Sequence, residues 1–222
     1  MYTAESAELL GDLEAFVDAE ESLRDVDPVA FEVSFGRPAE DDAERLARRE
    51  PVAIPLGGDR RLNVAGRIDR IDRVGRAPGH AYQVVDYKTG RYWHDDYAGT
   101  FVGGRLLQHA LYGRAAEELL AKIDSRARIT QGVYWFPTGR GWGKRVVVAA
   151  PAAGELQGVL ADLVGLVGDG AFTQTPDEKE CGRCDFRAAC GRQPWTDAAR
   201  KVEADSDDRG VCHDLSLTPE PA

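Results

Sequence analysis

The chain has 222 residues, 43% of them hydrophobic, which suits one folded domain with appended pieces. No apolar run approaches the length of a membrane-spanning helix, and the N-terminus lacks the apolar stretch of a secretion signal, so we expect a cytoplasmic protein with no membrane partner. The formal net charge of −10 argues against a generally basic nucleic-acid-binding surface, although it leaves room for a local one.

The hydrophobic pattern predicts both helices and strands. Apolar residues at helical spacing predict a helix over residues 4–22, and Pro28 prevents its continuation. Alternating segments bounded by glycine and proline predict strands at 29–35, 52–56, 61–73, 81–88, 129–136 and 144–149. Further helices are predicted at 106–121 and 152–167. This order predicts one mixed central β-sheet flanked by helices, in the α/β or α+β class.

Composition also suggests a division of the chain into four parts. Residues 1–28 form an N-terminal helical region, and residues 29–170 form the core. Residues 171–192 form a cysteine-bearing loop. Residues 193–222 are polar, acidic and rich in Asp and Pro, so we expect a poorly ordered tail.

The segments 66–72 (GRIDRID) and 84–90 (VVDYKTG) each place an acidic residue in an apolar, β-rich run. A bare carboxylate is unfavourable there unless something binds it. Turn-forming residues lie between the segments, and a hairpin about them brings Asp69 beside Val85 and Asp86. Opposed residues of a hairpin have Cβ atoms about 5 Å apart. Two carboxylates that close repel each other unless a cation lies between them.

Lys88 follows Asp86 by two residues, so it points to the same face of the strand. Two carboxylates and an ammonium at one sheet edge predict a divalent-metal site that hydrolyses phosphodiesters. The backbone carbonyl of Tyr87 is a natural further ligand, and Lys88 can orient the attacking water or stabilise charge on the phosphate. The alternative is ordinary surface alternation, in which these charges pair with neighbouring arginines.

Three of the four cysteines are clustered, in the spacing C-x2-C-x5-C, at Cys181, Cys184 and Cys190. Thiolates this close can hold one soft metal centre. Composition does not separate zinc from an iron–sulfur cluster.

The motifs GRIDRID, VVDYKTG and QHALY together resemble the PD-(D/E)XK nuclease superfamily, in particular the nuclease domains of RecB- and AddB-type exonucleases. The resemblance covers roughly residues 30–192 and implies a restriction-endonuclease-like fold. It implies that Asp69 and Asp86 bind Mg²⁺ or Mn²⁺ and that Lys88 is catalytic. It further implies that Gln108 positions the lysine or the DNA, and that Tyr112, one helical turn later, supports Gln108.

The resemblance also implies that the three clustered cysteines hold a [4Fe–4S] cluster that staples the domain, with zinc as the alternative. This chain departs from the family pattern because no cysteine precedes Cys181 and no histidine precedes His80. We expect that the chain is the C-terminal part of a longer protein, in which case the fourth ligand lies upstream. Alternatively, Cys212 or His213 supplies that ligand from the tail.

From this resemblance we expect a metal-dependent deoxyribonuclease with exonuclease-like action, which processes DNA ends in repair or recombination beside a helicase. A catalytically incomplete DNA-binding or structural remnant is the second hypothesis, because the family's upstream histidine and cysteine are missing. A zinc-stapled interaction module is the third.

Overall fold

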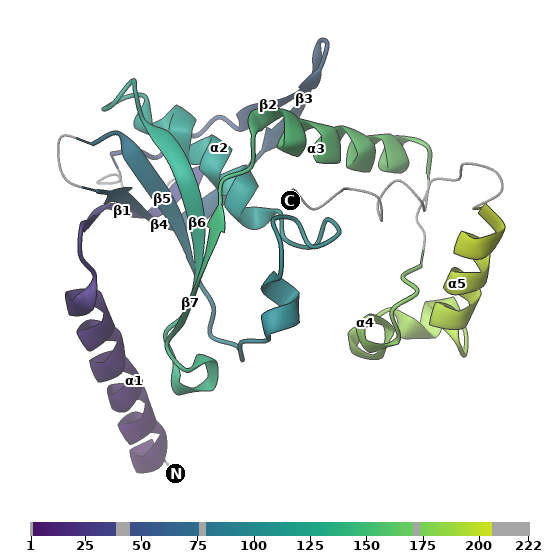
Figure 1. The fold of residues 1–222 in the computed structure, drawn as a ribbon, viewed down its shortest axis with the longest axis horizontal. Helices are drawn as coiled ribbons and strands as arrows, with labels where there is room; N and C mark the ends of the chain where they lie inside the picture. The colour runs from purple at the N-terminus through teal and green to yellow at the C-terminus, as the bar shows by residue number, and fades with distance from the viewer. Residues whose placement is uncertain (1, 39–44, 76–78, 171–173, 206–222) are drawn as a thin grey trace. The chain divides into compact units, whose positions relative to one another are not determined.

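The computed structural model describes residues 2–38, 45–75, 79–170 and 174–205 (Figure 1). The chain divides into two compact units, Met1–Leu156 and Gln157–Ala222. The first unit contains all the strands of these described ranges and the helices α1 and α2. The predicted boundaries at residues 28, 170 and 192 stay predictions. No helix within the described ranges is long and apolar enough to cross a membrane.

Five strands form the central sheet of the first unit, in the spatial order β1-β4-β5-β6-β7. Their bounds are Val26–Phe35, Gly66–Val74, Ala81–Tyr87, Arg128–Phe136 and Lys144–Ala149. All neighbouring strands are antiparallel except β5 and β6, which are parallel. A parallel pair needs a crossover connection, and helix α2 (Gln108–Leu120) lies within it. The predicted mixed sheet flanked by helices is confirmed.

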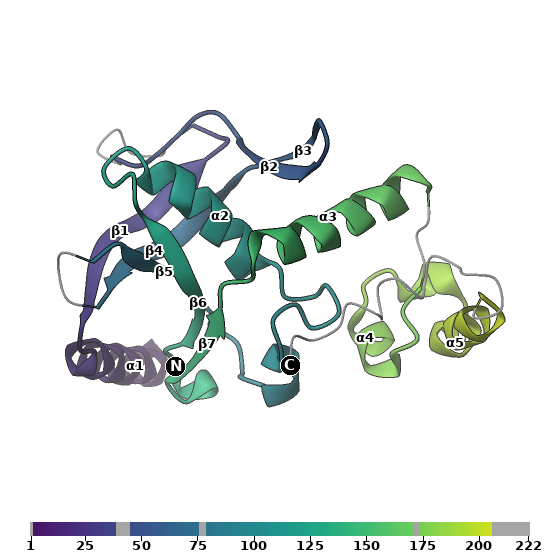
Figure 2. The same cartoon turned by 45° about the horizontal axis from the view of Figure 1, so that its top comes forward.

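Helices α1 (Tyr2–Ser22) and α2 pack on opposite faces of this sheet, as Figure 2 shows for α2. On the α1 face, Phe16 packs against the fully buried Trp135 with ring centroids 5.0 Å apart. On the α2 face, β6 approaches the helix so closely that a Cβ added to Gly132 would lie 2.5 Å from the Cβ of His109. A glycine is therefore required at this crossing.

The strand predicted over residues 61–73 is divided in the structure. Its first part is β3 (Arg60–Val64), which pairs with β2 (Val52–Gly57) in a separate two-stranded sheet. Its second part is β4, which joins the central sheet. The chain changes sheets at Ala65. This residue packs tightly on Gly36, because a Cβ added to Gly36 would lie 2.4 Å from the Cβ of Ala65. Alternation alone does not reveal this change, because both parts are extended.

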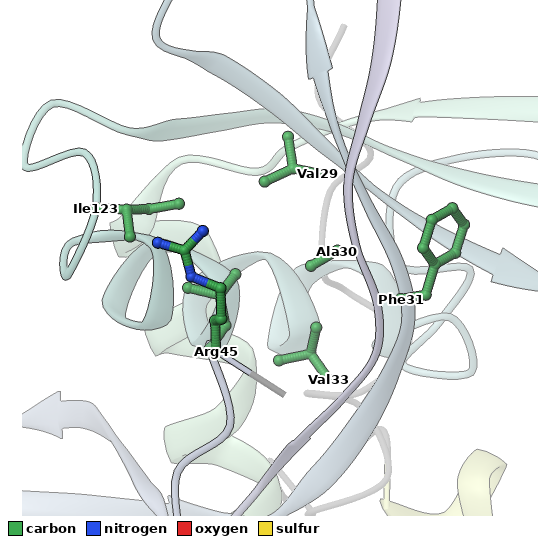
Figure 3. Close-up of a pocket in the computed structure, with 7 residues that line it drawn as sticks. Val29, Ala30, Phe31, Val33, Arg45 and Ile123 are labelled. Carbon is green, nitrogen blue, oxygen red and sulfur yellow. The ribbon is translucent and has the colours of Figure 1, made fainter. Parts of the chain in front are cut away.

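Strand β1 contains a local irregularity at Glu32, whose φ of 54° is unusual for a residue with a side chain. Figure 3 shows Val33 and Phe31 on opposite sides of the strand, although they are two residues apart. Val33 lines a small cavity of about 270 Å³ together with Val29 and Ile123. Phe31 also borders this cavity, but its ring lies beneath the guanidinium of Arg70, whose Cζ is 5.6 Å from the ring centroid. The left-handed residue between them accounts for the reversal.

The C-terminal part of the described chain is more helical than predicted. Helix α3 (Ala153–Gly168) matches the prediction. The cysteine segment, predicted as a loop, contains α4 (Glu178–Arg183) and a 3₁₀ turn at Arg187–Cys190. The expected disordered tail begins instead with α5 (Pro194–Asp205), where Pro194 suits the first turn of a helix and Ala198 is buried. Residues 206–222 of that tail lie outside the described ranges.

Candidate active site

The pairing of β4 with β5 brings the two predicted carboxylates to one face of the sheet. Ile71 lies opposite Val84 and Arg70 opposite Val85, so the next step along both strands brings Asp69 beside Asp86. Oδ2 of Asp69 accepts a hydrogen bond of 2.9 Å from the backbone N–H of Tyr87. The predicted hairpin is confirmed, although residues 76–78 of its turn lie outside the described ranges.

Asp86, Lys88 and Gln108 form a closed ring of polar contacts. The Lys88 Nζ lies 2.5 Å from Oδ2 of Asp86 and donates a hydrogen bond of 3.0 Å to Oε1 of Gln108. The Gln108 Nε2 in turn donates to Oδ1 of Asp86. Gln108 is the first residue of α2, so the start of this helix completes an arrangement that the end of β5 begins.

Asp86 is only 7% exposed. Burial raises the pKa of its carboxyl above the ordinary value, because the charged form loses hydration. The contact with Lys88 opposes this rise in pKa, whereas the charge of Asp69 adds to it. The site therefore holds a desolvated carboxylate beside a second one, with one ammonium in contact. Such a pair favours an additional cation.

Tyr112 lies one turn further along α2 than Gln108, as the sequence predicted. Its ring packs edge-on against Phe35 of β1, with centroids 6.1 Å apart. A Cβ added to Gly66, the first residue of β4, would lie 3.1 Å from the same ring. These contacts hold α2 against the strand that carries Asp69. They support a packing role for Tyr112.

The side chain of Tyr87 lies on the opposite face of the sheet from Asp86 and Lys88. There its hydroxyl accepts a hydrogen bond of 3.1 Å from Arg70, which is 2% exposed and also donates to Glu20 of α1. Arg70 further donates to the fully buried Asp72 at 2.5 Å, and Gln83 donates to Asp72 at 2.7 Å. We call this group the back-face network; it comprises Glu20, Arg70, Asp72, Gln83, Tyr87 and Gln131. Its hydrogen bonds hold β4 and β5, the two strands that carry Asp69 and Asp86, in register with each other.

Sequence reasoning missed Tyr134 and His109, which lie beside the ring of contacts formed by Asp86, Lys88 and Gln108. Tyr134 of β6 lies opposite Asp86 in the parallel ladder, and the Lys88 Nζ lies 5.7 Å from the centroid of its ring. The Tyr134 hydroxyl contacts His109, which follows Gln108 directly in α2. The only available signal was the alternation of β6, which does not report its register against β5.

The oxygen donors at this site fit a hard divalent cation. Mg²⁺ is commonly held by one or two carboxylates and keeps several of its waters. Asp69 and Asp86 supply two carboxylates, and the main chain of Tyr87 lies between Asp86 and Lys88. Within the described ranges, no group of three or more His, Cys, Asp or Glu side chains could hold a metal ion. A cation here would therefore depend on these two carboxylates, water and substrate.

The three clustered cysteines are free thiols in the second unit. Cys181 is buried, Cys190 is partly buried and Cys184 is exposed. Burial raises the pKa of the Cys181 thiol, and the nearby thiols of Cys184 and Cys190 raise it further. The proximity that the spacing predicted is present, but these side chains do not form a closed metal site in the described residues. Cys212 and His213 lie outside the described ranges.

Comparison with known families identifies the class of protein to which this site and sheet belong. The sequence model of the PD-(D/E)XK nuclease superfamily matches residues 2–191. The chain belongs to this superfamily, and its mixed sheet flanked by helices is consistent with the restriction-endonuclease-like fold.

Individual relatives narrow the likeness, and each is one subunit of an ATP-dependent helicase/deoxyribonuclease. The chain is similar to that of Symbiobacterium thermophilum, with 36% identity over 111 residues, or 50% of this chain and 9% of the relative. The protein of the same name from Moorella thermoacetica is 34% identical over 110 residues, 49% of this chain and 9% of the relative. The one from Clostridium tetani is 28% identical over 107 residues, 48% of this chain and 8% of the relative. Each match covers less than a tenth of the relative's own length.

Proposed function

We propose that this chain is a metal-dependent deoxyribonuclease that hydrolyses phosphodiester bonds, with exonuclease-like action on DNA ends. The observation that carries the proposal is the closed ring of Asp86, Lys88 and Gln108 beside Asp69. Membership of a nuclease superfamily and similarity to helicase/deoxyribonuclease proteins support it. Mg²⁺ or Mn²⁺ is the proposed cofactor.

Asp69 and Asp86 would hold the cation, with the carbonyl of Tyr87 as a further ligand. When bound, the cation would polarise the phosphate and lower the pKa of the attacking water. Lys88 would orient that water and stabilise the charge that develops on the phosphate oxygens. Gln108 would keep the ammonium of Lys88 in place, because its amide contacts both Lys88 and Asp86.

We propose a role in recombinational repair, in which the chain acts in the cytoplasm beside a helicase of the same chain or complex. The name of the similar proteins, which joins a helicase to a deoxyribonuclease, supports this partner. The chain matches only 9% of the length of the Symbiobacterium thermophilum protein, so a helicase partner for this chain is a proposal.

We also propose that Cys181, Cys184 and Cys190 hold a [4Fe–4S] cluster, with a fourth ligand from outside the described ranges. Their electrostatic proximity supports the proposal. Anaerobic reconstitution with iron and sulfide should produce a broad visible absorbance that Cys184→Ser abolishes. A colourless protein that binds zinc in proportion to these cysteines would instead favour the zinc-stapled alternative.

The nuclease is tested with end-labelled single- and double-stranded DNA in the presence of Mg²⁺ or Mn²⁺. We expect cleavage by the unaltered chain, loss of cleavage on chelation, and a reduction of about 10²- to 10⁴-fold in Lys88→Ala. Lys122→Ala is the matched control, because the Lys122 ammonium contacts the carbonyl of Ala47 instead. Equal cleavage by the Lys88→Ala and unaltered chains would contradict the assignment.

A remnant that binds DNA without cutting is the second candidate. The observation that favours it is that only two carboxylates gather at the site in the described residues, short of a three-ligand group. DNA binding without cleavage at any metal concentration would establish it.

A further inference from the structure

The ring beneath the Lys88 ammonium belongs to Tyr134, which is 1% exposed. A cation 5.7 Å from the centroid of an aromatic ring is attracted to the electron-rich face. Tyr97 packs on the same ring with centroids 5.1 Å apart, and Phe136 and Leu106 belong to the same buried cluster. Lys88 is thus held by Asp86, by Gln108 and by a ring that cannot move freely.

The hydroxyl of Tyr134 performs a second task at the start of α2. The residue that caps this helix is Leu107, and it makes no side-chain capping bond. A cap normally supplies an oxygen to the free N–H groups of the first turn. Here the backbone N–H of His109 donates to the Tyr134 hydroxyl at 3.2 Å. The cap of α2 therefore comes from the neighbouring strand.

His109 also fixes the orientation of that hydroxyl. Its Nδ1 lies 3.1 Å from the Tyr134 oxygen. In the neutral ring protonated at Nε2, Nδ1 accepts the hydroxyl hydrogen, and in the other neutral tautomer Nδ1–H donates to the same oxygen. Either pairing ties the hydroxyl to His109. Burial lowers the pKa of His109 to about 4, so the ring is neutral at physiological pH. The close approach of Gly132 to His109 leaves the imidazole little room to turn.

We propose that Tyr134, oriented by His109, is a positioning residue of the site. Its ring places the ammonium of Lys88, and its hydroxyl places the first residues of α2 and with them Gln108. One side chain thus aligns both partners of the Lys88–Gln108 hydrogen bond. The consequence for DNA cleavage rests on the proposed function, whereas the placement of Lys88 does not.

Tyr134→Phe tests this proposal, because it removes the hydroxyl and keeps the ring. We expect kcat on DNA to fall by about tenfold or more with KM little changed, since a small displacement of a reacting group lowers the rate steeply. Tyr82→Phe is the matched control. The Tyr82 hydroxyl donates to Asp124 beyond the other end of α2, at 3.0 Å, and the ring is equally buried. It should lose stability to a similar extent and retain kcat.

A second readout does not require activity. The chain has five lysines, so its lysine ¹³Cε spectrum is simple. The resonance of Lys88 is the one that disappears from this spectrum in Lys88→Arg. Tyr134→Phe should shift this resonance, whereas Tyr82→Phe should not. If the unaltered chain cuts no DNA but the resonance moves, the positioning role stands and the proposed activity fails. If neither kcat nor the resonance differs between the two variants, the positioning role is overturned.

His109 provides an independent pair of variants in case Tyr134→Phe folds poorly. His109→Asn keeps a polar amide near the place of Nδ1 that can pair with the hydroxyl, whereas His109→Leu removes any such partner. We expect kcat and the Lys88 resonance to stay near those of the unaltered chain in the first variant and to change in the second. Equal behaviour of the two would show that the hydroxyl needs no partner at Nδ1, which would contradict the proposal.

Discussion

Asp86 is only 7% exposed, and this burial raises the pKa of its carboxyl. The charge of Asp69 raises that pKa further, and Lys88 compensates in part. Residues held in this way favour ligand binding at some expense of stability. Asp86→Asn would remove the desolvated charge and keep an oxygen for the Gln108 amide.

We therefore expect Asp86→Asn to lose cleavage by at least about 10²-fold, as an essential ligand should, and to unfold at a temperature no lower than the unaltered chain. Cleavage assays and thermal unfolding measure the two effects. Asp95→Asn, at a fully exposed carboxyl, should change neither. A large drop in unfolding temperature in Asp86→Asn would show that the carboxylate is structural.

Asp124 gives a pH-dependent prediction. Its Oδ2 lies 2.7 Å from Nδ1 of His80, and this contact, with hydrogen bonds from the Arg126 backbone N–H and the Tyr82 hydroxyl, lowers the pKa of Asp124 from 3.8 to about 2. A carboxyl whose folded pKa is depressed stabilises the fold above its unfolded pKa and loses this effect as pH falls towards the folded pKa. The stability difference between the unaltered chain and Asp124→Asn should thus be constant near neutral pH and shrink below about pH 4.

Urea unfolding at several pH values between 6 and 3 measures that difference. Asp59→Asn, in the exposed turn between β2 and β3, is the control and should show no such narrowing. A difference between Asp124→Asn and the unaltered chain that stays constant down to pH 3 would mean that the hydrogen bonds to Asp124 do not lower its pKa in solution.

The residues of the site differ in how well sequence predicts them. Asp69, Asp86 and Lys88 could be predicted because a hairpin and a two-residue strand repeat are local sequence patterns. Gln108 came from the resemblance. Tyr134 could not be predicted from the sequence, because its place beside Asp86 depends on the parallel pairing of two strands that are far apart in sequence.

At the scale of elements, the crossing of α2 over β6 depends on the missing side chain of Gly132. An added Cβ would lie 2.5 Å from the Cβ and 3.5 Å from the Cα of His109, so the helix itself would have to move. We expect Gly132→Ala to lower the free energy of unfolding by about 1–3 kcal/mol, as overpacking does. Because the start of α2 carries Gln108, cleavage should fall as well.

Gly11→Ala is the matched control for that change. Gly11 lies inside helix α1, and nothing lies within 4 Å of a Cβ added there. Alanine is the better helix former, so this variant should gain about 0.5–1 kcal/mol. Denaturant unfolding of both variants, followed by cleavage assays, checks the pair. Equal stability of the two would contradict the tight crossing.

Elements themselves were predicted unevenly, for physical reasons. Strands β5, β6 and β7 and helices α2 and α3 fall within a few residues of their predicted bounds, because each has a clear period and turn residues at its ends. The division of residues 61–73 at Ala65 was missed because it reflects a change of partner strand. Helix α5 was missed because acidic composition obscured its short apolar face.

At the scale of the first unit, the back-face network joins α1 to three strands of the sheet. Arg70→Met would leave Asp72 fully buried without its cationic partner. Breaking a buried ion pair at one side typically lowers the free energy of unfolding by about 3–5 kcal/mol, and we expect a loss of that order. Arg61→Met, at an exposed position of β3, should change it by less than about 0.5 kcal/mol. Chemical denaturation of the two variants distinguishes them, and equal values would argue against the network.

The fold class of the whole molecule followed from the order of its elements, whereas its topology did not. The order of helix, strands, helix, strands and helix indicated a mixed sheet. It did not indicate that β1 would lie at one edge beside β4, or that β2 and β3 would leave the main sheet. These choices depend on contacts such as Phe35 against Tyr112, which join residues distant in sequence.

The back-face network has a consequence for how the strands find their alignment during folding. Side chains alternate along β5, so a slip of one residue against β4 would turn Asp86 and Lys88 away from α2 and turn Tyr87 towards it. The same slip would remove Gln83 from Asp72, so Oδ2 of this buried carboxylate would lose its donor while Oδ1 kept the one from Arg70. The back-face network thus favours the native register of β5 against β4. A misaligned pairing is less stable even before the site on the opposite face forms.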